Sequence, residues 1–186
     1  MTEKRELARL VKRARKGDVD AFGEIYDRCH DRVFAYVFRQ VGSKADAEDI
    51  TSGVFVYAFE RIDGFTWRGA GFAAWLFRIA RNDVLDYFRR RGSRAREVVL
   101  TDEIMQRPAA GTVDGQAEKA ENERKLLKAI GRLSDDQQQV VLLKLLSNMS
   151  NRQVGEIISK SEGAVKALQH RALISLRKYM EEERRK

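Results

Sequence analysis

The stretch from Trp75 to Arg91 combines arginine, asparagine and tryptophan in a spacing that suits contact with a nucleic acid. On a helix of 3.6 residues per turn, it divides into two faces. The apolar face carries Leu76, Phe77, Ala80, Val84 and Tyr87. The other face carries Trp75, Arg78, Asn82 and Arg89, with Arg81 and Asp86 at its flanks. Guanidinium groups hold phosphate, an amide reads a base edge and an indole stacks on a base. The alternative is an ordinary amphipathic helix with a solvated basic face.

The segment just before this helix, residues 63–72, is a glycine-rich loop that nevertheless holds three large aromatic residues, Phe65, Trp67 and Phe72. Loops rarely keep aromatic side chains unless these fold back on the core or meet a ligand. Because every base offers a π-face, aromatic side chains beside an Arg/Asn face are suited to holding bases out of a duplex.

Another helix is expected from Ser43 to about Ile62. Its first turns carry Asp46, Glu48, Asp49 and Ile50. Acidic residues near a helix N-terminus suit the helix dipole, which is sufficient to explain them. The functional interpretation is an acidic patch that docks on a basic protein partner. Apolar residues around Phe55 supply more apolar surface than one buried stripe requires.

Near the C-terminus, two helices separated by a short turn match a helix-turn-helix. Ser150 and Gln153 form a capping-box start for the first, and Ser161 caps the second, which runs from Glu162 to about Glu181. The second helix should turn Val165, Leu168, Ala172, Leu176 and Tyr179 inward. Its outward residues are Gly163, Lys166, Ala167, His170, Arg171 and Lys178. Small residues at its start, including Ala164, keep that end slim enough to enter a major groove, and His170 is a phosphate or base contact rather than a metal ligand.

Composition and charge place these segments in an almost wholly helical chain with a polyanionic partner. A single Pro among 186 residues and few β-branched runs predict an all-α fold, and the net charge of +8 favours nucleic acid. One Cys and two His exclude a disulfide framework and argue against a zinc site. Without a signal-like or 18-residue apolar stretch, the chain is expected to be cytoplasmic.

Charge reverses along the middle of the chain, which predicts two small helical domains joined by a flexible acidic linker. Residues 78–96 carry seven Arg against two Asp, whereas residues 97–123 carry seven Asp+Glu against two Lys+Arg and the only Pro. The predicted units are residues 1–96, a linker over 97–119 and residues 120–186. A 27-residue stretch could reach about 90 Å, enough to let the halves touch separate sites on one duplex.

Taken together, these motifs resemble the extracytoplasmic-function (ECF) group of RNA polymerase sigma factors, and a BldN-like subset in particular. The likeness covers about residues 15–92 and 120–180. Its main motifs are Ala47-Glu48-Asp49-Ile50 with Val54-Phe55, Ala74-Trp75-Leu76, Arg78-Ile79-Ala80-Arg81-Asn82 and Gly163-Ala164-Val165-Lys166. Departures from the family's usual pattern are Leu133-Ser134, Gln153-Val154-Gly155, Lys160 and Leu168.

The resemblance implies a role for each motif. Residues expected to bind the clamp helices of the polymerase β′ subunit are Asp46, Glu48, Asp49, Ile50 and Phe55. Residues expected to recognise and melt the −10 element are Phe65, Trp67, Trp75, Arg78, Arg81, Asn82, Asp86, Arg89 and Arg90. Residues expected to read the −35 element are Ser161, Glu162, Gly163, Ala164, Lys166, Ala167, His170, Arg171 and Lys178. The implied partners are core RNA polymerase (β′ clamp helices and β flap), promoter DNA and an anti-sigma factor. No cofactor, metal or small-molecule substrate is implied.

Two other classes of function remain at this stage. A self-standing helix-turn-helix repressor or activator would explain the C-terminal half but has no need of the aromatic loop and second basic helix. An enzyme would need an acid–base pair, a nucleophile or a phosphate-binding loop, and the sequence contains none in recognisable form.

Overall fold

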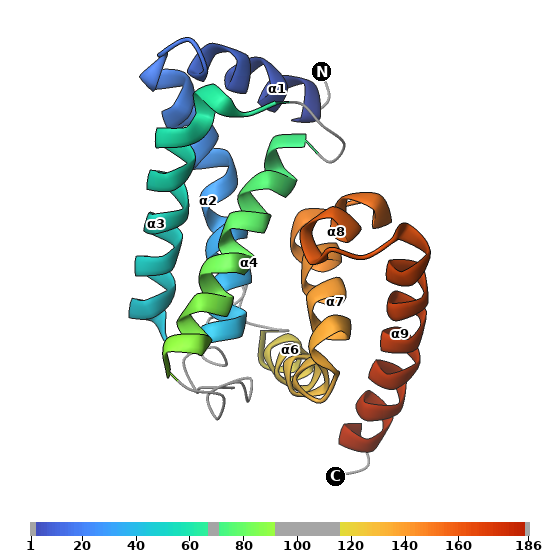
Figure 1. The fold of residues 1–186 in the computed structure, drawn as a ribbon. Coiled ribbons are helices and arrows are strands. Elements are labelled where there is room, and N and C mark those ends of the chain that lie inside the picture. The colour runs from blue at the N-terminus through green and yellow to red at the C-terminus, as the bar shows by residue number, and fades with distance from the viewer. Residues whose placement is uncertain (1–2, 67–70, 92–115, 185–186) are drawn as a thin grey trace.

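The computed structural model describes residues 3–66, 71–91 and 116–184, whose regular elements are all helices, with no strand among them (Figure 1). The predicted all-α fold is therefore confirmed. The helices form two groups, one from each half of the chain. Most of the predicted linker lies outside the described residues. None of the helices that the structure describes is both long and apolar enough to cross a membrane.

The N-terminal group is a four-helix bundle. Its helices are α1 (Glu3–Ala14), α2 (Val19–Val41), α3 (Lys44–Arg61) and α4 (Gly71–Arg91), with a short 3₁₀ turn at Ile62–Gly64. Helix α2 packs against the other three helices, and α3 packs on α4. The core is filled by buried apolar side chains, including Ile25, Val33, Val54, Leu76 and Val84. Leu76 and Val84 belong to the apolar face of α4 that the spacing predicted.

Helix starts in this bundle are fixed by local hydrogen bonds. Asp18 caps α2, where its Oδ1 accepts from the Ala21 amide at 2.9 Å, and Ser43 Oγ accepts from the Asp46 amide at 3.3 Å to cap α3. Between them, Gly42 ends α2 with a left-handed φ of 74°. This tight junction turns the chain back so that α2 and α3 run side by side.

The C-terminal group contains α6 (Gln116–Gly131), α7 (Asp135–Ser147), α8 (Asn151–Ile158) and α9 (Glu162–Arg184). Helix α6 begins four residues earlier than the predicted domain boundary at residue 120. The predicted capping box of α8 is present: Gln153 N donates to Ser150 Oγ at 3.2 Å, and Ser150 N donates to Gln153 Oε1 at 3.0 Å. Helix α9 packs against α6, α7 and α8.

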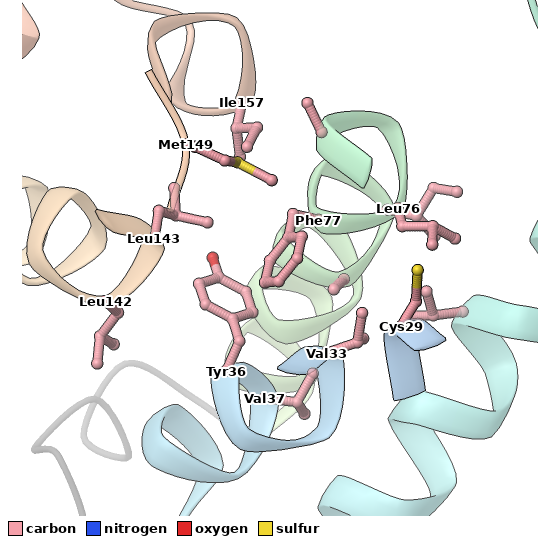
Figure 2. Close-up of a cluster of buried hydrophobic side chains, with 14 of the residues drawn as sticks. Cys29, Val33, Tyr36, Val37, Leu76, Phe77, Leu142, Leu143, Met149 and Ile157 are labelled. Atoms are coloured by element: carbon pink, nitrogen blue, oxygen red, sulfur yellow. The ribbon is translucent and has the colours of Figure 1, made fainter. Parts of the chain in front are cut away.

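The two groups are in contact with each other. Helix α8 packs on α4, and α7 packs on α2, as the middle of Figure 1 shows. Buried side chains from both halves belong to one apolar cluster. In Figure 2, Tyr36 and Phe77 of the N-terminal bundle face Leu143, Met149 and Ile157 of the C-terminal one. The charge pattern of the sequence predicted two domains but not this shared surface.

Candidate nucleic-acid and polymerase interfaces

Three aromatic rings meet where the 3₁₀ turn leads into α4. The Phe65 ring lies 5.2 Å from the ring centroids of both Phe72 and Trp75, and Phe72 and Trp75 are 5.3 Å apart. Phe65 and Phe72 are buried, whereas Trp75 is only half-buried. Phe65 therefore folds back on the core and supports the Trp75 indole, which keeps an accessible face. Trp67 lies outside the described residues.

Beside these rings lies a cleft of about 430 Å³. The wall formed by the N-terminal bundle includes Arg61, Phe65, Trp75 and Arg78. The opposite wall is formed by Glu156 and Ile157 of α8. A cleft with an indole and two guanidinium groups can accept a flat ring together with a phosphate. The sequence did not single out Arg61, because its place beside the cleft depends on how α3 packs on α4.

The polar face of α4 is exposed for much of its length. The exposed residues are Arg78, Asn82, Arg89 and Arg90, and Asp86 forms an ion pair with Arg89. Arg81 differs, because its Nε is buried without a hydrogen-bond partner among the described residues. The structure thus brings together most of the predicted strand-facing residues but holds Arg81 apart from them.

At the start of α3, the acidic residues split into two environments. Glu48 and Asp49 are exposed. Asp46 instead lies against α4, where its Oδ2 accepts a 2.8 Å hydrogen bond from the Tyr87 hydroxyl and is 3.3 Å from Arg91. The Tyr87 hydrogen bond is the main reason that the pKa of Asp46 is lowered; the Ser43 hydroxyl and the Arg91 charge add to it, and partial burial opposes it.

The same helix exposes an apolar surface that sequence reasoning noticed only as an excess of apolar residues. Val56 is 58% exposed and Phe59 is 47% exposed, and Tyr57 beside them is also exposed. Phe55 is buried and stacks edge-on against Tyr26 at 4.8 Å, so it supports this surface from beneath. Ile50 is half-buried at the edge. Exposed apolar groups beside Glu48 and Asp49 are typical of a protein-binding surface.

Helices α8 and α9 form the predicted helix-turn-helix, and its turn is tightly constrained. Lys160 N donates to Gly155 O at 2.9 Å, and a Cβ atom on Gly155 would lie only 2.4 Å from Lys160 O. Ser159 adopts a left-handed conformation with a φ of 58°. Gly155, where the sequence departs from the family's usual pattern, therefore allows the close approach of turn and helix.

The first turns of α9 present the predicted outward residues to solvent. Ser161 caps the helix, with its Oγ accepting from the Ala164 amide at 3.2 Å. Residues exposed along this face are Glu162, Gly163, Lys166, Ala167, His170, Arg171 and Lys178, whereas Ala164 is half-buried. Val165, Leu168, Ala172 and Leu176 are buried on the other side, as predicted. The arrangement leaves a slim, basic, solvent-facing helix surface that fits a major groove.

Two family models match this chain: Sigma-70 region 2 over residues 25–94 and Sigma-70 region 4 over residues 123–176. The first spans the aromatic cleft and the acidic start of α3, and the second spans the helix-turn-helix. The chain is 40% identical to the ECF RNA polymerase sigma factor BldN of Streptomyces coelicolor over 183 residues, covering 96% of this chain and 67% of that protein. It is 31% identical to the ECF RNA polymerase sigma factor SigW of Bacillus subtilis, covering 94% of this chain and 96% of that protein.

Solved structures share the arrangement of helices. The complex of CnrH with the cytosolic domain of CnrY matches with a TM-score of 0.67 and 24% identity, covering 92% of this chain and 95% of that one. The complex of the sigma factor RpoE with the anti-sigma factor NepR from Bartonella quintana matches with a TM-score of 0.66 and 24% identity, covering 86% and 96%. The fold agrees with these structures, and the sequence matches decide the family: this chain belongs to the ECF sigma factors of RNA polymerase.

Proposed function

We propose that the N-terminal domain, residues 1–96, binds core polymerase and melts the −10 element, while residues 120–186 bind the −35 element. The acidic segment 97–119 joins them. The observation that carries this division is the pair of surfaces described above, an indole-and-arginine cleft in one half and an exposed basic recognition helix in the other. The chain acts in the cytoplasm as a regulatory subunit with no catalytic chemistry of its own.

Core polymerase would bind at α3. Glu48 and Asp49 supply negative charge and Ile50 supplies an apolar edge, and the neighbouring Val56, Tyr57 and Phe59 extend the surface. Such a combination suits the β′ clamp helices, where apolar burial supplies affinity and charge selects the partner. Asp46 and Phe55 would act indirectly, Asp46 by fixing the start of α3 and Phe55 by supporting the surface.

The −10 element would bind along α4. Trp75 stacks on an unpaired base in the cleft, while Arg78, Arg89 and Arg90 hold the strand by its phosphates and Asn82 reads a base edge. Phe65 positions Trp75, and Asp86 orients Arg89 through their ion pair. Trp67 and Arg81 complete the predicted set, Arg81 only after its buried Nε is freed.

The −35 element would bind α9 in its major groove. Lys166, His170, Arg171 and Lys178 supply the charge and the hydrogen-bond donors, while Glu162, Gly163, Ala164 and Ala167 form the slim end that approaches the base edges. Ser161 offers its backbone amide at the start of the helix to a phosphate. The β flap of the polymerase would hold this domain in place at the promoter.

We also infer that an anti-sigma factor controls this chain. The RpoE structure of Bartonella quintana was solved with the anti-sigma factor NepR. Its helices are arranged like those of this chain over most of its length, so a partner of the same class could bind here.

Run-off transcription with purified core polymerase and genomic DNA fragments tests the proposed function. New discrete transcripts that depend on this chain are expected, and their start points give the −10 and −35 sequences. If no transcript and no complex with core polymerase form while duplex DNA is still bound, the chain acts as a self-standing DNA-binding regulator and the proposal is wrong.

A further inference from the structure

Helix α1 carries a line of cationic side chains on its solvent-facing side. Residues 5–16 contain six Lys and Arg against one Glu. At 3.6 residues per turn, four of these cations lie within about 60° of one another around the helix axis. All four are exposed, and we call them the cationic stripe: Arg5, Arg9, Lys12 and Lys16. The stripe faces directly away from the bundle, because Leu10, Val11 and Ala14 on the opposite side of α1 are buried.

The four side chains of the stripe form no ion pair or hydrogen bond with any residue that the structure describes. The acidic groups nearby pair with other cations. Asp18 and Glu24 lie 2.8 and 3.6 Å from Arg13, and Glu6 lies 3.4 Å from Arg28 of α2. Like charges three or four positions apart repel each other along a helix, so the stripe does not stabilise α1. A bound polyanion would remove this repulsion.

Helix α1 is held at the end of the bundle that bears the aromatic cleft. Figure 1 shows α1 lying across the end where α3 stops and α4 begins, and α1 packs against both the 3₁₀ turn and α4. The Arg15 guanidinium donates to the carbonyl oxygen of Asp63 in that turn at 3.3 Å. The next two residues, Gly64 and Phe65, line the cleft. DNA that extends beyond the cleft at this end of the bundle would therefore meet the stripe.

The length of the stripe suits a run of phosphates on one DNA strand. Eleven helical steps separate Arg5 from Lys16, which corresponds to about 16 Å at 1.5 Å per residue. Phosphates of one strand of a duplex recur about every 3.4 Å along the helix axis, so the stripe spans roughly five base pairs. Four cations over this length are enough to contact most of the phosphates that face them.

We propose that the cationic stripe binds the phosphate backbone of the duplex that borders the −10 strand. Trp75 and Arg78 would hold the unpaired strand in the cleft, and the stripe would anchor the adjoining duplex through its phosphates, without reading its sequence. This inference rests on the proposed −10 role of the cleft. It adds to that role a separate anchoring surface, on a helix that none of the proposed base contacts uses.

The test compares three full-length proteins: the wild type, the double variant Arg9→Ala/Lys12→Ala and the double variant Arg124→Ala/Lys128→Ala. The second pair is the matched control, because it removes one Arg and one Lys from exposed positions on α6. Alanine has the highest helix propensity, so both double variants should keep their helices, which circular dichroism verifies.

Fluorescence anisotropy measures the affinity for labelled DNA over a range of salt concentrations. The probes are a single strand of about 12 nucleotides, a hairpin stem of about eight base pairs, and the strand joined to the stem through its 5′ or its 3′ end. The stem exceeds the roughly five base pairs that the stripe spans. Both joined probes are needed because the direction of the strand along α4 determines which of them places the stem beside α1.

On one of the two joined probes, Arg9→Ala/Lys12→Ala should lower the slope of log affinity against log salt by about 1.8 relative to the wild type. This value corresponds to two lost phosphate contacts at about 0.9 each. The α6 control should match the wild type on that probe. On the single strand alone, all three proteins should have the same slope, because that probe fills only the cleft.

Equal slopes for the wild type and the stripe variant on both joined probes would overturn the proposal. An equal decrease in both double variants would overturn it too, because the response would then follow net charge. A decrease already present on the single strand would overturn the assignment to duplex. If the wild type does not bind the single strand, the −10 role of the cleft fails. The isolated stem then decides the matter: a smaller slope in the stripe variant alone supports the duplex contact, and equal slopes overturn it.

Discussion

The Tyr87 hydroxyl donates a hydrogen bond to Asp46 Oδ2 at 2.8 Å, which ties the last turns of α4 to the first turn of α3. Arg91 completes the contact, since its guanidinium lies 3.3 Å from the same carboxylate oxygen and 4.7 Å from the centre of the Tyr87 ring. The link joins the helix proposed to bind polymerase to the helix proposed to bind the −10 strand. It therefore fixes the geometry of one surface relative to the other.

Replacing Tyr87 with Phe should lower the free energy of unfolding by about 0.5–1.5 kcal/mol, the usual net value of one hydrogen bond. The pKa of Asp46 is lowered by this hydrogen bond, so its stabilisation is complete above the unfolded pKa of about 4. It is lost as the pH falls through the lower folded pKa. Urea unfolding at pH 7 and below pH 4 measures this effect. The difference in the free energy of unfolding between the wild type and Tyr87→Phe should be smaller in acid. Tyr26→Phe, at a partly exposed ring, is the control and should change little.

Gly155→Ala should destabilise the helix-turn-helix by about 1–3 kcal/mol, because the new Cβ would lie 2.4 Å from Lys160 O and force the turn to shift. Gly163→Ala is the matched control in α9, where a Cβ meets no atom within 4 Å. That change should raise stability by about 0.5–1 kcal/mol. Thermal unfolding measures both. Equal effects of the two substitutions would contradict the close approach.

Asn82→Ala should impair promoter opening more than it impairs binding to core polymerase. Asn82 is exposed on α4, so its removal should leave the bundle intact. Loss of a base-edge contact costs about 1–3 kcal/mol, which corresponds to a drop in open complex of roughly tenfold or more. Permanganate reactivity of the −10 thymines reports opening, and co-elution with core polymerase reports binding. Asn122→Ala, at an exposed position on α6, is the control and should leave promoter opening and binding to core polymerase unchanged.

Lys166→Ala and Arg171→Ala should weaken binding of the −35 duplex and reduce its dependence on salt. Each phosphate contact that is lost should lower the slope of log affinity against log salt by about 0.9. Lys128→Ala removes the same charge from an exposed position on α6 and is the control. An equal change of slope in Lys128→Ala would indicate a response to net charge rather than contacts of α9.

Asp49→Arg should reduce affinity for core polymerase by tenfold or more, because it places a like charge against a basic partner. The exposed side chain of Asp49 has room for the larger group, so folding should be unaffected. Asp31→Arg makes the same charge change at a side chain that is 93% exposed on α2. Affinity that is unchanged in Asp49→Arg would indicate that the acidic start of α3 serves the helix dipole alone.

Features set by residues close together in sequence could be predicted from the sequence. Asp18, Ser43 and Ser150 each cap a helix through an amide three residues away, so the helix starts follow from local pattern. The buried side of α9 likewise follows from apolar spacing. The charged residues of its exposed recognition surface occupy the helix positions that this apolar spacing leaves on the other side.

Features set by tertiary packing could not be predicted in this way. The family's motifs group Phe65 and Phe55 with the contact residues, yet each is buried and has another aromatic ring, Trp75 or Tyr26, against it. The helical spacing places Arg81 at a flank of the polar face of α4, whereas its Nε is buried in the structure. The Tyr36–Gln139 hydrogen bond joins residues 103 positions apart, and no local pattern signals such a pairing.

Because α4 and α8 belong to one chain, the contact between the two domains is unimolecular. Dilution leaves it unchanged, and a partner that separates the domains competes with a tethered neighbour whose effective concentration is on the order of millimolar. The 24 residues between Arg91 and Gln116 set that concentration through their number. Lengthening this segment with Gly and Ser should therefore shift the balance toward separated domains without altering a single contact.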